Sequence, residues 1–314
     1  MKPLHLTTPK PRKDIMELRT LKYFLAIARE ENMTNAANLL HVSQSALSRQ
    51  ISDLEDELNT TLFIRQSRKM ILTEDGMRLR KRAEEITSLV LRTELEFQSN
   101  DDDISGDIFI GAGETYIMKL ISKTIRRIHE TYPNIKFHLF SGVADDIAER
   151  IDHGLIDFGL LFEPVNKEKY DYIEIPVKER LGVIMRKDNP LATQKFIDAD
   201  TLKQMPLIYS SRQKMGQSFF HGWSDLSWND LNTIGTYNLI YNASFLVEDG
   251  IANALCIDQL VSKENLTFIP LKPTIELPIV FVWKKFKVSS KASEIFLNEV
   301  RKDMLKLYEE KHIH

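Results

Sequence analysis

The sequence is poor in the features that define several classes of protein. Its single cysteine, Cys256, stands in an apolar stretch, which excludes an internal disulfide and a redox switch between two cysteines. We interpret Cys256 as a small, buried apolar side chain. No apolar run approaches the roughly 18 residues needed to span a bilayer, and the N-terminus lacks the apolar segment of a signal peptide. The sequence therefore predicts a cytoplasmic protein without a membrane partner.

The motifs of common enzymes and metal sites are also missing. Gly111-Ala112-Gly113 follows a predicted strand as a dinucleotide fingerprint would, but Tyr116 stands where the third glycine belongs. His129-Glu130 lacks the second histidine of a zinc-protease helix. No Gly-x-Ser-x-Gly segment occurs, and none of the eight histidines is spaced to pair with a nucleophile. The sequence thus predicts no catalytic residues, no cofactor and no metal site.

Charge is unevenly distributed along the chain. The 314 residues are 43% hydrophobic and 28% charged, which is typical of a soluble protein with two or three domains. The net charge of -3 argues against a nucleic-acid partner, yet residues 1–82 hold 15 Lys+Arg and 10 Asp+Glu. That part therefore carries +5 and the remainder -8. The basic part is where we look for DNA binding.

A segment within residues 34–76 has the pattern of a DNA-reading helix. Leu47, Ile51, Leu54 and Leu58 recur at the spacing of one helix face, and Ser43 precedes them as an N-cap. The opposite face carries small hydrogen-bonding groups and one arginine, which suit base edges and phosphates. Acidic residues follow, so only the first two turns can approach a phosphate backbone. The pattern predicts a recognition helix that reads DNA with its N-terminal residues.

Flanking segments complete a winged helix-turn-helix. A first helix is expected from residue 18 to about residues 30–32, and Thr34 is expected to cap a short helix over residues 35–40. Residues 65–69 are basic and residues 70–73 extended, which predicts a two-stranded wing with a basic tip. The predicted DNA contacts are Thr34, Asn35, Ser43, Gln44, Ser45, Ala46, Ser48, Arg49, Gln50, Arg65, Arg68, Lys69 and Thr73.

These residues also resemble a known family. The segment is similar to the winged helix-turn-helix of LysR-type transcriptional regulators at Ala36-Ala37, Leu40, Ser43-Gln44-Ser45, Leu47-Ser48, Ile51, Leu54-Glu55, Leu62-Phe63, Arg65, Leu72-Thr73 and Gly76. Length and layout fit that family from about residue 16 to the end. An amphipathic hairpin in an unrelated domain is the alternative, and the ordered match through the wing disfavours it.

A long linker helix is predicted over residues 76–99, after a DNA-binding domain over residues 16–75. Apolar residues recur there at alternating spacings of four and three, a heptad seam that needs a partner helix. Because helix-turn-helix proteins pair to reach two half-sites, we predict dimerisation through this seam, with packing inside one chain as the alternative. The predicted seam residues are Leu79, Ala83, Ile86, Val90 and Phe97, together with Thr93.

Two short segments are predicted to lack regular structure. Residues 1–15 hold three prolines and four Lys/Arg without periodicity, which indicates a disordered extension; a basic arm on DNA is the alternative. Translation starting at Met16 is compatible with this interpretation. Residues 100–106 are polar, acidic and end on glycine, which predicts a hinge.

Residues 107–314 alternate between strands and helices, which predicts a parallel α/β sheet. Strands are expected over residues 107–111, 135–141, 157–162, 181–186, 207–210, 233–237, 252–257 and 277–283. Helices are expected over residues 117–131 and 145–153, with a long closing helix around residues 295–307. These units exceed one small sheet, so we predict two lobes.

The family resemblance gives this region a role. It implies an effector domain that resembles type 2 periplasmic binding proteins, with lobe I over about residues 107–178 and 277–314 and lobe II over about residues 179–276. By the same resemblance, the effector-binding residues are Thr115, Tyr116, Ser141, Gly142, Ser210, Ser211 and Asn242. A small-residue turn at a helix N-terminus favours an anion, so an anionic inducer is expected near Thr115. A plain N-cap is the alternative role of Thr115.

The sequence as a whole is interpreted as a LysR-type transcriptional regulator. It is expected to bind double-stranded operator DNA as a homodimer or homotetramer, to respond to a small-molecule inducer between two lobes, and to have RNA polymerase as a further partner. The alternatives are a solute-binding protein and an enzyme fused to a DNA-binding domain. The missing signal peptide opposes the first, and the missing catalytic motif opposes the second. An absorbance spectrum and a salt-dependent DNA shift assay separate the three.

Overall fold

The structure, a computed structural model, describes residues 16–66, 69–97, 104–211, 223, 226–286 and 290–312. The chain forms two compact units, Met1–Glu94 and Leu95–His314. The predicted extension over residues 1–15 and most of the predicted hinge lie outside the described residues. Within the described ranges, no helix combines the length and apolar character needed to cross a membrane.

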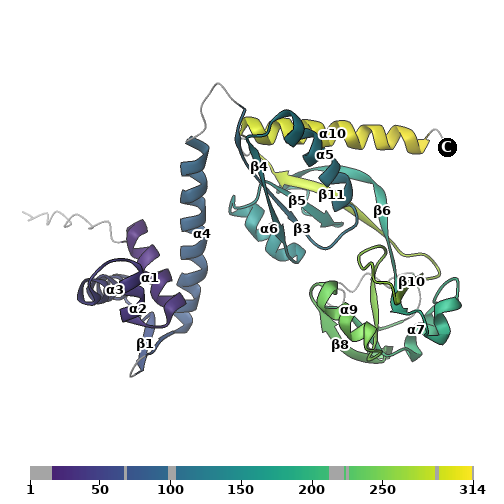
Figure 1. Cartoon of the computed structure of the whole chain (residues 1–314), viewed down its shortest axis with the longest axis horizontal. Coiled ribbons are helices and arrows are strands. Elements are labelled where there is room, and N and C mark those ends of the chain that lie inside the picture. The colour runs from purple at the N-terminus through teal and green to yellow at the C-terminus, as the bar shows by residue number, and fades with distance from the viewer. Residues whose placement is uncertain are drawn as a thin grey trace, which may run out of the picture. The chain divides into compact units, whose positions relative to one another are not determined.

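The first unit is a winged helix-turn-helix followed by a long helix (Figure 1). It contains α1 (Leu18–Glu30), α2 (Met33–Leu39), α3 (Gln44–Leu58), β1 (Phe63–Gln66), β2 (Lys69–Leu72) and α4 (Glu74–Phe97). The helices share one apolar core, in which Phe24, Leu47 and Ile51 are fully buried. β1 and β2 pair antiparallel. The predicted helix-turn-helix and two-stranded wing are therefore present.

One predicted helix cap is wrong. The cap of the short second helix was expected at Thr34, but the N-cap of α2 is Asn32. The Asn32 side chain accepts hydrogen bonds from the backbone N–H groups of Thr34 and Asn35. Asparagine and threonine both suit an N-cap, so residue type alone did not separate them. Ser43 caps α3 as predicted, because its Oγ accepts a hydrogen bond from the Ala46 N–H at 3.2 Å.

The first turns of α4 pack into the core of their own unit. Ala83 is fully buried there, and Leu79 packs against the same core. The predicted dimer seam is therefore wrong at Ala83, and Leu79 is also used within the chain. Ile86 is 40% exposed, whereas the Phe97 side chain lies outside the described residues. The pattern misled because an apolar helix stripe packs on its own domain as readily as on a partner.

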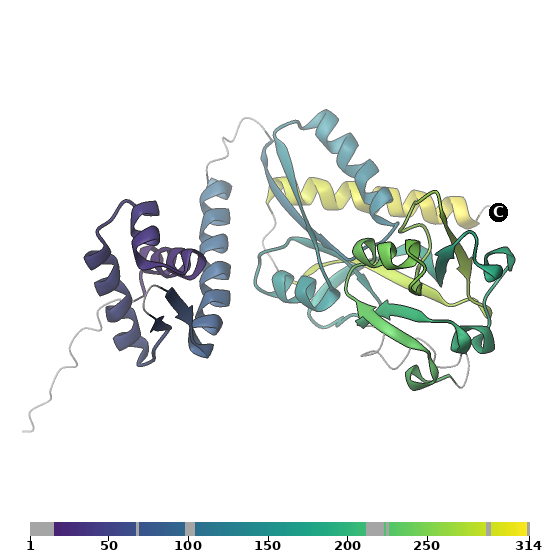
Figure 2. The same ribbon diagram turned by 60° about the horizontal axis from the view of Figure 1, so that its bottom comes forward.

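The second unit consists of two lobes joined by paired strands (Figures 1 and 2). Lobe I contains β3 (Gly106–Ala112), α5 (Met118–Thr131), β4 (Ile135–Ser141), α6 (Ala144–Asp152), β5 (Phe158–Phe162), β11 (Glu276–Lys284) and α10 (Lys291–His312). Its strand order is β4-β3-β5-β11-β6, and β6 (Tyr170–Arg186) continues into lobe II. α5 and α10 cover one sheet face around Phe281 and Phe296, while α6 covers the other around Ile147 and Val282.

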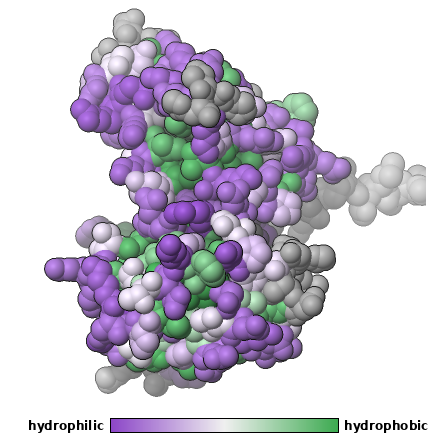
Figure 3. Space-filling view, turned by 90° about the vertical axis from the view of Figure 1, so that its right-hand side faces the viewer, coloured by the Kyte–Doolittle hydropathy of each residue, from purple (hydrophilic) through white to green (hydrophobic). Residues whose placement is uncertain are grey.

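Lobe II is a second sheet layered between helices. It contains the C-terminal part of β6 with η1 (Pro190–Thr193), α7 (Ala199–Gln204), β7 (Leu207–Ser210), η2 (Trp228–Asp230), β8 (Thr233–Tyr237), α9 (Ile240–Glu248), β9 (Asn253–Ile257) and β10 (Leu266–Pro270). Leu202 of α7 lies in the core on one face, and Val247 of α9 in the core on the other. In Figure 3 the two lobes appear as two masses with apolar surface on both and a narrower, more hydrophilic waist between them.

The predicted parallel sheet is correct for only part of this unit. β3 pairs in parallel with β4 and β5, and β7 pairs in parallel with β8 and β9. β11 is antiparallel to β5 and β6, and β6 is antiparallel to β9 and β10. The sheet is therefore mixed. Strands that are buried on both faces carry continuous apolar runs in either arrangement, so the sequence pattern did not distinguish them.

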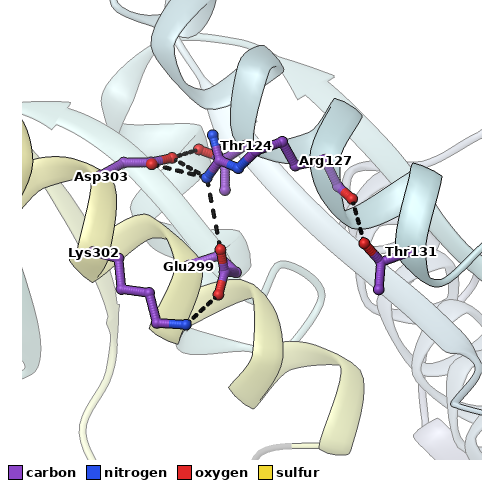
Figure 4. A network of polar contacts seen from close by, with 6 residues as sticks. All are labelled: Thr124, Arg127, Thr131, Glu299, Lys302 and Asp303. Carbon is purple, nitrogen blue, oxygen red and sulfur yellow. Dashed lines mark hydrogen bonds and ion pairs between the residues drawn. The ribbon is translucent and has the colours of Figure 1, made fainter.

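A polar network fastens α10 to α5 in lobe I (Figure 4). Arg127 on α5 donates two hydrogen bonds to the Asp303 carboxylate, at 2.7 and 2.8 Å, and Thr124 donates to the same carboxylate. Glu299, one turn earlier on α10, lies 3.7 Å from Arg127 and also pairs with Lys302. Because Thr124 is fully buried, its hydroxyl needs this acceptor. The network holds the closing helix at one position on the sheet.

Candidate functional site

The exposed face of α3 carries the central residues of the predicted DNA interface. Ser45, Ala46 and Arg49 are exposed, while Leu47 and Ile51 on the opposite face are fully buried. Small side chains in the first turn let a helix approach base edges closely, and an arginine reaches a phosphate or a guanine. The helix is thus fixed to the domain by one face and presents the other to solvent.

Two more of the residues predicted to contact DNA, Gln44 and Gln50, make hydrogen bonds inside the unit. Gln44 Oε1 accepts a hydrogen bond from Thr34 Oγ1 at 3.2 Å, which ties the start of α3 to α2. Gln50 is half-buried, and its Oε1 accepts a hydrogen bond from Thr20 Oγ1 on α1 at 3.4 Å. Gln50 therefore has a partner within its own domain, and its DNA contact stays a prediction. Asn35 is exposed at the start of α2.

The wing adds positive charge next to the recognition helix. Arg65 on β1 donates a hydrogen bond from Nη2 to Ser48 Oγ of α3 at 3.4 Å, so wing and helix form one surface. Lys69 Nζ on β2 lies 3.7 Å from the Glu31 carboxylate, with both side chains more than half exposed. Arg68, predicted at the wing tip, lies outside the described residues.

Two polar side chains of this region make hydrogen bonds that stabilise the fold. The Thr73 hydroxyl donates to the carbonyl of Thr61 at 2.7 Å and accepts from the Gly76 N–H at 2.9 Å. Thr73 therefore caps α4, and its DNA contact stays a prediction. Glu55 Oε1 accepts hydrogen bonds from the N–H groups of residues 62 and 63, at 2.7 and 3.1 Å, and so fixes the entry to the wing.

A cavity of about 400 Å³ lies between lobe I and lobe II. Residues at the carboxyl ends of β3, β4 and β5 line it from lobe I, and residues at the ends of β7, β8 and β9 line it from lobe II. In open α/β sheets, ligands bind outside the carboxyl ends of the strands. The volume also falls in the range of sites for small molecules. We refer to this space as the interlobe cavity.

The residues predicted to bind an effector separate into three groups. Those that line the interlobe cavity are Gly142 and Ser210. Those that line a neighbouring cavity, which shares Glu114 with the first, are Thr115, Tyr116 and Ser141. The two that are exposed and line neither are Ser211 and Asn242. The structure therefore brings only part of the predicted set together, and Ser211 and Asn242 are not retained as ligand contacts.

The anion site predicted at the start of α5 is filled by a carboxylate of the chain itself. Glu179 on β6 is 5% exposed, and its Oε1 accepts hydrogen bonds from Thr115 Oγ1 at 2.5 Å and from the Ile117 N–H at 3.2 Å. Thr115 Oγ1 in turn accepts from the Ile117 N–H at 3.1 Å. These donors already have an internal acceptor in the structure, and the effector contact at Thr115 stays a prediction.

A second internal carboxylate caps a helix of lobe II. Glu114, which follows β3 in lobe I, accepts a hydrogen bond from the backbone N–H of Ile240, the first residue of α9. The N-cap residue of α9, Leu239, provides no side-chain cap, so Glu114 satisfies this helix terminus from the other lobe. The contact puts a negative charge on the wall of the interlobe cavity and connects the two lobes.

Sequence reasoning missed both carboxylates. Glu114 and Ile240 are 126 residues apart in the chain, and Thr115 and Glu179 are 64 residues apart. No local spacing marks such a pair. The sequence offered one weak signal, which was that the acidic residue Glu114 comes directly after a predicted strand. Acidic residues are also common at solvent-exposed positions, so this signal does not identify a buried contact.

The polar side chains on the lobe II wall of the cavity are neutral. Tyr237 donates a hydrogen bond from its hydroxyl to the Leu255 carbonyl at 2.7 Å. Burial raises the pKa of the Tyr237 phenol and also the pKa of the Cys256 thiol. Both groups therefore remain protonated at neutral pH, and the interpretation of Cys256 as a buried small side chain agrees with its 2% exposure.

Together, the two units define a class of protein: a winged helix-turn-helix DNA-binding protein with a two-lobed ligand-binding unit. Residues 18–77 match the family described as "Bacterial regulatory helix-turn-helix protein, lysR family", and residues 101–305 match the "LysR substrate binding domain". The chain therefore belongs to the LysR family and is a LysR-type transcriptional regulator with a DNA-binding and a substrate-binding domain.

Its relatives are transcriptional regulators. The HTH-type transcriptional regulator BsdA of Bacillus subtilis is 35% identical over 143 residues, which are 45% of this chain and only about half, 49%, of BsdA. The uncharacterized HTH-type transcriptional regulator YvbU of Bacillus subtilis is 24% identical over 92% of this chain and 99% of its own length. The crystal structure of CbnR, a LysR family transcriptional regulator, shares the fold with a TM-score of 0.73 and 20% identity, over 92% of this chain and 99% of that chain.

Proposed function

We propose that this regulator reads its operator with the first turns of α3 and holds the flanking DNA backbone with the wing. The observation that carries the proposal is the asymmetry of α3, in which Ser45, Ala46 and Arg49 are exposed on a helix anchored by its buried face. Base edges specify sequence and phosphate contacts fix position. Ser45 and Ala46 then determine sequence preference, and Arg65 and Lys69 supply phosphate contacts. The protein acts by binding, without catalysis.

The regulator acts as an oligomer in this proposal. Ile86 and Leu89 of α4 are 40% and 43% exposed, and Val90 is half-buried beside them. Apolar side chains on a long helix favour pairing with a second helix, and an operator with two half-sites needs two recognition helices. The assembly is a homodimer or a homotetramer of such pairs, and RNA polymerase is the partner through which the bound protein affects transcription.

The interlobe cavity is the proposed site of a small-molecule inducer. Gly142 and Ser210 line it from opposite lobes, so a ligand between them contacts both. A ligand that binds one arrangement of the lobes better than another shifts the population towards it. Thr115 is not part of this proposed site, because its hydroxyl donates to Glu179. The function of the whole protein follows as operator binding that responds to a metabolite in the cavity.

Selection of duplexes from a random-sequence pool by the full-length protein tests the DNA part of the proposal. We expect a selected sequence with two half-sites whose centres lie about one helical turn, or a multiple of it, apart. Arg49→Ala should lose this selection, whereas Lys123→Ala, an exposed change on α5, should not. A selected pool without any common sequence, or unchanged selection by Arg49→Ala, would contradict the proposed interface.

A further inference from the structure

The charged side chains that line the interlobe cavity all have the same sign. Among the lining residues in the described part of the chain, the charged ones are Glu114, Asp145 and Glu163, and none is Lys, Arg or His. The nearest ion-pair partner of Glu163 is Lys167 at 3.7 Å, whose side chain is 54% exposed and does not line the cavity. Salt screens the exposed charge of Lys167 more strongly than the charge of Glu163 on the cavity wall, so Lys167 offsets the Glu163 charge only in part.

The helix N-termini at this cavity and at the neighbouring one each have a carboxylate of the chain beside them. The first turn of α9 donates to Glu114, and the first turn of α5, at the neighbouring cavity, donates to Glu179. The start of α6 lines the cavity as well, but its first turn carries Asp145 and Asp146, whose charges oppose the positive end of the helix. An anionic ligand would therefore meet a carboxylate of the chain at each of these helix ends.

The remaining wall of the cavity is largely apolar. From lobe I it includes Leu160 and Phe162, and from lobe II it includes Leu239, Ile257 and Leu260. Apolar surface of this kind binds the hydrocarbon part of a ligand by excluding water, while a few polar groups fix its orientation.

We propose that the ligand of the interlobe cavity is an organic cation, in which an amine or guanidinium group is attached to an apolar chain or ring. The cationic group lies among the carboxylates of lobe I, and the apolar part lies against lobe II. This inference rests on the proposed function, which places the inducer in this cavity, and adds the chemical class of the ligand.

Calorimetric titration of the full-length protein with three matched probes tests the charge of the ligand. Benzylammonium, benzyl alcohol and phenylacetate share one apolar group and differ in the charge of the other. We expect benzylammonium to bind at least about tenfold more tightly than phenylacetate, with the alcohol between them, because like charges on the wall repel the anion. The preference for the cation should weaken as salt is added.

Variants assign the effect to residues. Glu163→Gln should weaken benzylammonium binding about fivefold, since it removes one charge near the ligand without changing side-chain size. Glu168→Gln removes an exposed charge that does not line the cavity and should leave the affinity unchanged. Asp145→Asn provides a second test on a different wall segment. If neither Glu163→Gln nor Asp145→Asn changes the preference for the cation, the assignment to these carboxylates is wrong.

Two further outcomes separate this inference from the proposed function. Phenylacetate binding as tightly as benzylammonium would overturn the cationic class and leave the cavity as the ligand site. Ser210→Phe fills the cavity from lobe II, and its fold can be checked by circular dichroism. If this variant folds and binds all three probes unchanged, the interlobe cavity is not the ligand site and the proposed function fails as well. If the wild-type protein binds none of the probes at millimolar concentration, the cationic class is overturned and the cavity remains as the proposed site.

Discussion

The Glu179 carboxylate lies against the Thr115 hydroxyl, where the strand between the lobes passes the start of α5. Glu179 is 5% exposed and Thr115 9% exposed, so neither group has water as an alternative partner. A buried carboxylate that loses a donor keeps its desolvation cost without the compensating bond. The pair therefore has a structural role that a ligand contact at Thr115 would disrupt.

Thr115→Val should destabilise the second unit and leave DNA binding unchanged. The substitution keeps the shape but removes a donor to a buried charge, so we expect a loss of about 1–3 kcal/mol in the free energy of unfolding. Thermal unfolding of the full-length protein measures this as a lower Tm for that unit. Thr131→Val is the matched control, because it removes an exposed hydroxyl on the same helix. Equal stability of the two variants would show that the Thr115 bond contributes nothing.

Recognition helix and wing should respond differently to substitution. Ser45→Ala should change sequence preference by about 1–3 kcal/mol for each disturbed base contact. Arg65→Ala should weaken binding to all duplexes and reduce the salt slope by about one unit for the lost phosphate contact. Fluorescence anisotropy on a selected operator and on a scrambled duplex, over a range of salt, measures both. A change of preference in Arg65→Ala at an unchanged salt slope would reverse the two assignments.

Lysine on the exposed face of α4 should dissociate the oligomer. Ile86→Lys and Leu89→Lys each place a charge where we expect an apolar contact between two chains, at a cost of several kcal/mol if the charge cannot reach water. Sedimentation velocity should then show a smaller species than for the wild type. Ser88→Lys adds the same charge at an exposed position between them on a different face and should not dissociate the oligomer. Native mass in both Ile86→Lys and Leu89→Lys would exclude this face as the interface.

Gly76→Ala should destabilise the DNA-binding unit although alanine is the better helix former. A Cβ at this position in the first turn of α4 would lie 2.2 Å from the backbone carbonyl oxygen of Leu62. Backbone cannot move aside as a side chain can, so we expect a cost of about 1–3 kcal/mol from overpacking. Hydrogen exchange at the wing and the start of α4 measures it. Protection equal to that of the wild type would mean that the close approach is relieved without cost.

The first unit was largely predictable because local patterns determine it. Leu47, Ile51 and Leu54 mark the buried face of α3 directly, and Ser43 marks its start. Hydrogen bonds between different helices and strands of this unit could not be predicted, because no local pattern marks them. Gln50 bonds to Thr20 on α1, and a half-buried glutamine looks the same in sequence as one that faces DNA.

In the second unit, the strands and helices with clear periodicity were predicted, and the others were missed. The first half of β6, the helices α7 and α9, and the strand β10 were not anticipated. α9 is apolar on most of its surface, and Tyr241 and Phe245 are exposed on it, so it lacks the two-sided pattern that identifies a surface helix. β11 is antiparallel because it pairs with β5 and β6. No local sequence pattern specifies which strands it pairs with.

The interlobe cavity was the least predictable part, because both lobes contribute to it. Gly142 and Ser210 were placed correctly on the cavity wall by the family resemblance, since strand ends are fixed by the fold. The charge of the wall depends on Glu114, Asp145 and Glu163, which no motif marks. Glu114 acquires its role only when the first turn of α9 is brought to it by the packing of lobe II.

The two lobes are joined by a continuous hydrogen-bonded ladder instead of a flexible linker. Residues 178–184 of β6 each have a partner on β11 or β9, and the Leu181 N–H donates to the Ile275 carbonyl at the crossing itself. A change in the angle between the lobes must therefore twist paired strands. Twisting paired strands costs more free energy than moving a flexible loop, and it allows a smaller displacement. Phe281 of β11 packs against Phe296 of α10. The strand that pairs with β6 at the crossing is therefore the same strand that supports the longest helix of lobe I.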